Sequence, residues 1–284
     1  SIYGALKALF ANCETRFNAG LFKNDEALNA LKVQDKTLGT IIAELYYPAC
    51  EYEFSVIPVE ILGSIYERFL GRIIRFKRKT KNGHSVKIIE KPEVQKAGGV
   101  YYTPRYIVNY IVKETIGKKI EGLTPEKVSS LKVCDPSCGS GSFLVGAYQY
   151  LLNWHFDYYY SEERRKKSEK NGLIYKDARS HEYKLSIEEK RRILLANIYG
   201  VDIDGQAVEV TKLSLFLKLL ENEGSALSKH GQASLFKTSE LKKILPSMHE
   251  NIKCGNSLIG SDYYYDAGED LFTLEDQKRV NAFD

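Results

Sequence analysis

The sequence predicts an α/β fold with a doubly wound, mostly parallel sheet, preceded by an N-terminal helical segment. Three short apolar runs have the length and composition of buried strands: residues 131–135, 198–202 and 251–254. Helical patterns alternate with them along the chain, at residues 104–120, 142–160, 186–197, 205–222 and 239–245. Such alternation of strands and helices is typical of parallel sheets that carry helices on both faces.

Two segments precede this core. Residues 1–70 carry helical patterning broken by Pro48 and Pro58, which predicts a helical lead-in packed against the core. Residues 71–98 form a basic hairpin or loop, since the segment from Gly71 to Lys96 has nine Lys or Arg against two Asp or Glu, and Asn82-Gly83 is a hairpin turn signal. We expect it to contact DNA or a partner domain, or else to be a solvated hairpin whose lysines prevent edge pairing.

A glycine-rich turn follows the first strand, where the chain reads Asp135-Pro136-Ser137-Cys138-Gly139-Ser140-Gly141-Ser142-Phe143. A strand–turn–helix order leaves the first backbone N–H groups of the helix unpaired and directed at a ligand. Glycines at 139 and 141 let that ligand approach the main chain. The turn therefore predicts a small cofactor with an anionic end. It matches neither the dinucleotide fingerprint, whose third glycine is Leu144 here, nor a P-loop, which needs a lysine.

Asp202 ends the second strand, at the carboxyl edge of the predicted sheet, where ligands bind in open α/β folds. Asp204 suits the N-cap of the next helix. That helix, from Gly205, is apolar almost all round, so we expect it to be buried between the sheet and the lead-in. The polar stretch from Tyr158 to Glu189, between the turn and Asp202, predicts a surface insertion or a helix extension.

Four segments, taken in order, carry a resemblance to a known family: Gly99–Arg105, Asp135–Phe143, Asn197–Asp204 and Asn251–Gly260. Together they resemble the motifs of N6-adenine DNA methyltransferases, in the branch of type I and type IIG restriction–modification enzymes. The resemblance covers residues 60 to 284 and implies a Rossmann-like methyltransferase core over residues 99–284. It also implies S-adenosylmethionine as cofactor and double-stranded DNA as the partner of the full-length enzyme.

The resemblance further implies roles for individual residues. One group matches the segment that lies over S-adenosylmethionine and reaches its methionine end: Tyr101, Tyr102, Thr103 and Pro104. A second group matches the loop that holds the amino and carboxylate groups: Asp135, Ser137, Cys138 and Gly139. Asp202 matches the acceptor of the ribose hydroxyls, and Ile203 would pack against the adenine ring. Asn256 matches a position, often Asp, that contacts the exocyclic amine of adenine.

No catalytic residue is assigned. The family methylates a flipped adenine with an Asn/Asp-Pro-Pro-aromatic tetrapeptide, and no Pro-Pro occurs in this sequence. We expect a fragment of a larger enzyme, inactive alone, that stops at Asn281–Asp284 where the next strand would begin. A natural relic without the loop is the alternative.

Other classes stay open: a non-catalytic module that binds S-adenosylmethionine or acts as a scaffold, and a methyltransferase with a non-DNA substrate. By analogy with the family, partners would include an upstream nuclease and carboxy-terminal target-recognition domains or subunits. No apolar run approaches the roughly 20 residues of a membrane span. Five cysteines without ligand spacing predict no metal site and a reducing compartment, so we expect a cytoplasmic protein without membrane contact.

Overall fold

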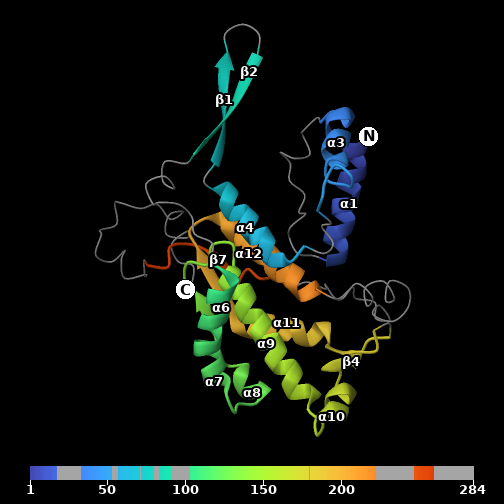
Figure 1. The fold of residues 1–284 in the computed structure, drawn as a ribbon, viewed down its shortest axis with the longest axis vertical. Coiled ribbons are helices and arrows are strands. Elements are labelled where there is room, and N and C mark those ends of the chain that lie inside the picture. The colour runs from blue at the N-terminus through green and yellow to red at the C-terminus, as the bar shows by residue number, and fades with distance from the viewer. Residues whose placement is uncertain are drawn as a thin grey trace.

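The computed structural model describes residues 1–17, 33–52, 57–70, 72–79, 83–90, 103–178, 180–221 and 246–258. Within these residues the chain forms a mixed helix and sheet unit, with N-terminal helices and a projecting two-stranded hairpin (Figure 1).

The central sheet has three parallel strands in the order β3-β6-β7. Their bounds are β3 (Val133–Asp135), β6 (Ile198–Asp202) and β7 (Ile252–Cys254). The register pairs Asp135 with Gly200 and Asp202 with Cys254, so all three strands end at one edge. The three predicted strands are therefore confirmed, the first and the third in a shorter form than predicted.

Helices pack against this sheet. The predicted helix at 104–120 is confirmed as α6 (Arg105–Val112), the π-helical turn η1 (Lys113–Gly117) and α7 (Lys118–Ile120). The other confirmed helices are α9 (Ser142–Tyr160), α11 (Ile187–Asn197) and α12 (Gly205–Leu220). A short helix, α8 (Pro125–Val128), is additional. The predicted helix at 239–245 lies outside the described residues.

Helix α9 is the centre of the core. It contacts β3, β6, α6, α11 and α12, and its Leu144, Tyr148 and Leu151 are fully buried. Helix α12 lies against β6, β7 and α4, with Leu215, Phe216 and Leu219 buried. The expectation that the helix from Gly205 is buried between the sheet and the lead-in is thus confirmed.

The insertion between residues 158 and 189 has more regular structure than its polar composition predicts. After α9 it forms α10 (Arg165–Lys170) and an antiparallel pair, β4 (Ile174–Lys176) with β5 (Tyr183–Leu185). Ile174 and Leu185 pair across the strands and are buried in the core. The stretch around these strands is polar and charge-dense, so no apolar run marked them in the sequence.

The N-terminal part is helical as predicted, with α1 (Ile2–Phe17), α3 (Asp35–Ala43) and α4 (Val59–Leu70). Helices α1 and α3 pack on each other, while α4 packs on α12 (Figure 1). The basic segment forms β1 (Arg72–Lys79) and β2 (Gly83–Glu90), which pair antiparallel from Arg72↔Glu90 to Lys79↔Gly83. The domain boundaries themselves stay a prediction. Of the helices in the described ranges, none has the length and apolar character needed to cross a bilayer.

Candidate functional site

Three loops meet at the carboxyl edge of the sheet and hydrogen-bond to one another. The Gly139 N–H, after β3, donates to Oδ2 of Asp202 at the end of β6, at 2.8 Å. The Gly255 N–H, after β7, donates to the Asp202 carbonyl at 3.0 Å. The Ser257 hydroxyl donates to the Pro136 carbonyl at 2.7 Å, so the loop after β7 is also bonded to the loop after β3. Residues from three distant segments of the sequence thereby form one continuous surface.

Asp202 is the centre of these contacts. Its Oδ1 accepts the Asp204 N–H at 2.9 Å, while Oδ2 accepts the Gly139 N–H. The protein's own carboxylate therefore takes the Gly139 N–H, which precedes the first turn of α9, where the sequence predicts N–H groups free for a ligand. Each carboxylate oxygen has two lone pairs, so both oxygens can still accept a hydroxyl group from a ligand.

The turn itself depends on two glycines in the left-handed region, Gly139 at φ 53° and Gly141 at φ 83°. Gly141 is the N-cap of α9, and as a glycine it offers no side-chain acceptor to the first turn of that helix. The Thr211 hydroxyl of α12 donates to the Gly139 carbonyl at 2.8 Å and thereby holds the turn against α12. The start of α9 therefore lacks the usual side-chain cap, which favours an anionic group placed there.

A further predicted residue, Asp135, adds a second carboxyl group to this edge. Asp135 is half-buried and accepts the Ser137 N–H at 3.1 Å. Burial raises the pKa of the Asp135 carboxyl, the neighbouring Asp202 raises it further, and the Ser137 N–H opposes both. Burial, with Asp202 and Asp135, also raises the pKa of the Cys138 thiol to about 12. Cys138 is therefore a neutral, buried thiol and no nucleophile, while the carboxylates favour a positively charged ligand group.

The segment before α6 reaches the same end of the molecule. Val108 of α6 packs on Gly146 of α9, and further along Gly117 packs on Tyr150, so the two helices run in the same direction. Pro104 is the N-cap of α6 and thus lies at the same end as the N-terminus of α9, with the half-buried Thr103 before it. The predicted residues Tyr101 and Tyr102 lie outside the described residues.

Two more predicted residues, Ile203 and Asn256, follow the ends of β6 and β7. Ile203 follows directly after β6 and is 74% exposed, so its side chain leaves an apolar surface open at the edge. Asn256 accepts the Leu258 N–H on Oδ1 at 3.0 Å. The oxygen that the resemblance assigns to an adenine amine therefore already has one donor and keeps one lone pair.

Helix α4 also reaches this edge, which the sequence did not indicate. The Tyr66 hydroxyl donates to Oδ2 of Asp204 at 3.4 Å, and Gly63 lies against the buried Ser140 of the glycine turn. Burial raises the pKa of the Tyr66 phenol, and the Asp204 carboxylate raises it further. The three-residue spacing of Gly63 and Tyr66 places both on one helix face, but nothing in the sequence indicates that this face meets Asp204.

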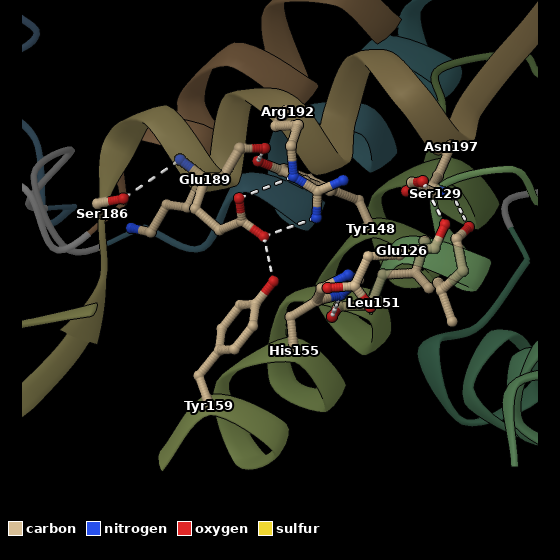
Figure 2. A network of polar contacts seen from close by, with 12 residues as sticks. Glu126, Ser129, Tyr148, Leu151, His155, Tyr159, Ser186, Glu189, Arg192 and Asn197 are labelled. Carbon is tan, nitrogen blue, oxygen red and sulfur yellow. Dashed lines mark hydrogen bonds and ion pairs between the residues drawn. The ribbon is translucent and has the colours of Figure 1, made fainter. Parts of the chain in front are cut away.

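A second polar cluster lies in the helical layer, between α9 and α11 (Figure 2). Glu189 accepts the Tyr159 hydroxyl at 2.8 Å, and Arg192 donates to Glu189 from Nη2 at 2.6 Å and from Nε at 2.8 Å. His155 Nδ1 donates to the Leu151 carbonyl at 2.8 Å, and its Nε2 is buried without a partner. Glu189 is 3% exposed and His155 is 0% exposed, so the cluster joins helices inside the core and is closed to a substrate.

A cleft of about 540 Å³ lies elsewhere, next to α9, β5, α11 and α12. Leu152, Phe156, Lys184, Lys190 and Lys218 are among the residues that line it. It contains none of the predicted site residues. The sheet edge is the better candidate because its carboxylates and the uncapped start of α9 converge on one place. In the described ranges no group of three His, Cys, Asp or Glu side chains could hold a metal ion.

Comparison with known proteins shows the family to which the chain is related. Residues 113–263 match the family model described as the DNA-methyltransferase domain of MmeI. The chain is 33% identical over 271 residues to the type II restriction enzyme and methyltransferase RM.Eco57I of Escherichia coli, covering 95% of this chain and 24% of that protein. It is 28% identical to the putative type II restriction enzyme and methyltransferase RM.MjaORFECS2P of Methanocaldococcus jannaschii, over 86% of this chain and 21% of that protein.

A third relative is the adenine-specific methyltransferase BrxX of Escherichia coli O9:H4 (strain HS), 21% identical over 65% of this chain and 15% of that protein. The chain thus spans less than a quarter of the length of these relatives. The family model covers more than half of the chain, and the edge of the sheet lies inside it. The chain therefore belongs to the family of the MmeI DNA-methyltransferase domain, among the methyltransferases of restriction–modification systems.

Proposed function

We propose that this chain binds S-adenosylmethionine at the carboxyl edge of β3, β6 and β7, as the cofactor-binding part of a DNA adenine-N6 methyltransferase. The observation that carries the proposal is the convergence of Asp202, Gly139 and the start of α9 on one surface. The finer fold belongs to the same proposal: a Rossmann-like, doubly wound sheet with this edge as its ligand-binding side.

The chemistry of the cofactor fits the charges present. S-adenosylmethionine supplies a methyl group on a positively charged sulfonium, with an amino acid at one end and adenosine at the other. Asp135 and the turn residues Ser137, Cys138 and Gly139 would receive the amino acid, whose carboxylate suits the uncapped start of α9. The one carboxylate of the ligand would thus meet backbone N–H groups at the start of α9, and its ammonium group would meet the Asp135 carboxyl.

The adenosine end has its own partners. The remaining lone pairs of Asp202 would accept the ribose hydroxyls, and the exposed Ile203 would cover one face of the adenine. Asn256 would accept the exocyclic amine with the lone pair that Leu258 leaves free. The methionine end of the cofactor would be covered by the segment before α6, which contains Tyr101, Tyr102, Thr103 and Pro104.

The substrate proposed is the exocyclic amine of adenine in double-stranded DNA. Two relatives carry both restriction enzyme and methyltransferase in their names, and BrxX is named adenine-specific. Methyl transfer would use residues outside this chain, and nuclease and target-recognition parts would be supplied by the remainder of a longer protein or by partners. A cytoplasmic location belongs to the same proposal.

Isothermal titration calorimetry with S-adenosylmethionine tests the site directly. The wild-type chain should bind with one-to-one stoichiometry, and Asp202→Ala should weaken binding at least about tenfold through loss of charge-assisted hydrogen bonds to the ribose. Asp157→Ala, at an exposed position of α9, is the matched control and should bind like the wild type. Wild-type affinity in the Asp202 variant would reject the proposed ribose contact.

A further inference from the structure

Helix α4 is anchored to the core at three points that recur every third residue. Glu60 pairs with the buried Lys218 of α12, with Oε1 and Nζ 3.4 Å apart. Gly63 lies so close to the glycine turn that a Cβ placed on it would be 3.0 Å from the Ser140 Oγ. Tyr66 reaches Asp204 at 3.4 Å. Residues three apart lie on neighbouring positions of one helix face, so a single face of α4 makes all three contacts.

The contact at Tyr66 continues into the sheet edge. Its hydroxyl donates to Oδ2 of Asp204, and the Asp204 N–H donates to Oδ1 of Asp202 at 2.9 Å. The other oxygen of Asp202 accepts the Gly139 N–H at 2.8 Å. Asp204 also accepts the Gln206 N–H at 2.9 Å, which fixes it as the N-cap of α12. A continuous set of hydrogen bonds therefore leads from α4 to the glycine turn.

The contact at Gly63 reaches the turn by a second route. Ser140 is 1% exposed and lies between the two glycines whose positive φ angles shape the turn. Residue 63 has no side chain, so the α4 backbone lies directly over Ser140. A larger residue there would separate α4 from the turn or displace Ser140.

We propose that α4 forms a wall of the cofactor site and that Tyr66 is a positioning residue, which orients Asp202 through Asp204. The inference rests on the proposed function, since it concerns the same S-adenosylmethionine site. Docking of α4 and cofactor binding are then coupled in both directions, because a coupling free energy between two equilibria is reciprocal. Helix α4 thereby senses whether the cofactor is bound.

The first test removes the Tyr66 hydroxyl. Tyr66→Phe should weaken S-adenosylhomocysteine binding by about threefold to tenfold, the effect of losing one hydrogen bond of ordinary net strength. It should also reduce the preference for S-adenosylhomocysteine over its 3′-deoxyribose analogue, because the ribose contact of Asp202 is loosened. Tyr52→Phe is the matched control, since Tyr52 is 70% exposed.

The second test separates α4 from the turn. Gly63→Leu and Ile65→Leu both place a leucine on α4, but only the first places it against Ser140, since Ile65 is 42% exposed. Gly63→Leu should weaken binding, and Ile65→Leu should leave it unchanged. In the wild type, the ligand should slow amide hydrogen exchange in residues 59–66 as well as at the turn.

The outcomes separate this inference from the proposed function. A wild-type chain that binds no S-adenosylhomocysteine overturns the proposed function and the inference with it. A wild type that binds, combined with an unchanged ribose preference in Tyr66→Phe and unchanged exchange in α4, overturns the inference alone. A Tyr66→Phe variant that is less stable but keeps the full ribose preference shows a purely structural role and also overturns it.

Discussion

The Asp202 carboxylate and the Gly139 N–H are 2.8 Å apart, so the tip of β6 and the turn before α9 share one hydrogen bond. The group proposed to bind the ribose is therefore also the group that holds the turn in shape. Substitutions at this position act on ligand affinity and on the free energy of unfolding at once, and the two effects can be separated by the choice of substitution.

Asp202→Asn should reduce both the affinity for the ligand and the free energy of unfolding. An amide has only one oxygen for the N–H groups of Gly139 and Asp204, and its NH₂ group places a donor against one of them. We expect a loss of about 1–3 kcal/mol in the free energy of unfolding, measured by urea denaturation, as one of these donors is left without its acceptor. Calorimetry should show weaker S-adenosylmethionine binding in the same variant. A variant with wild-type stability would show that the Asp202–Gly139 bond does not hold the turn.

Gly141→Ala should be more destabilising than Gly122→Ala. Both glycines have positive φ, 83° and 69°, so alanine is strained at either position. At Gly122 a Cβ would meet nothing within 4 Å, whereas at Gly141 it would lie 2.8 Å from Thr211 Cγ2. We expect about 1 kcal/mol at Gly122 and about 2–4 kcal/mol at Gly141 from urea denaturation. If both variants lost the same free energy of unfolding, the Thr211 side chain would be able to move away without cost, and the turn would be loosely packed.

Stability should fall as the pH falls below the ordinary pKa of histidine, because of His155. Burial lowers the pKa of His155 in the folded state, although the Leu151 carbonyl and Glu189 oppose this. The unfolded chain therefore takes up a proton first, so the contribution is complete above about pH 6.5 and is lost as the pH decreases. Between about pH 7.5 and about pH 5.5, His155→Phe should show a smaller drop in unfolding free energy than the wild type. An identical drop would assign the pH dependence to other groups.

Glu189 also makes stability depend on pH, but at lower pH than His155 does. Burial raises the pKa of its carboxyl, but hydrogen bonds from Arg192 and Tyr159 outweigh this and the pKa is lowered overall. Its contribution is thus present above the ordinary pKa of 4.5 and is lost as the pH falls through the lower, folded value. Glu189→Gln should therefore cost stability near neutral pH and flatten the profile in the acid range, as followed by urea denaturation at each pH.

Much of this fold was predictable because its signals are local. Strand–turn–helix order around Gly139 and Gly141, the apolar helix from Gly205 and the N-cap at Asp204 each depend on neighbouring residues. The strands β4 and β5 were not predictable, because they lie in a polar, charge-dense stretch and are held by tertiary packing of Ile174 and Leu185.

The position of Asp202 at the edge of the sheet was predictable, but the hydrogen bonds that it makes were not. Spacing placed Asp202 at the edge of the sheet, yet no pattern could show that its carboxylate takes the Gly139 N–H, a contact across 63 residues. The hydrogen bond from Tyr66 to Asp204 joins residues 138 positions apart, and no pattern in the sequence indicates it either. Contacts of this kind depend on how elements pack, and only the three-dimensional arrangement reveals them.

A crystal structure of the chain with S-adenosylhomocysteine tests the central claim most directly. We expect the amino acid end over Gly139 and Gly141 and the ribose hydroxyls within hydrogen-bond distance of Asp202. Density for the ligand in the cleft lined by Phe156 and Lys218, with the sheet edge empty, would contradict the account.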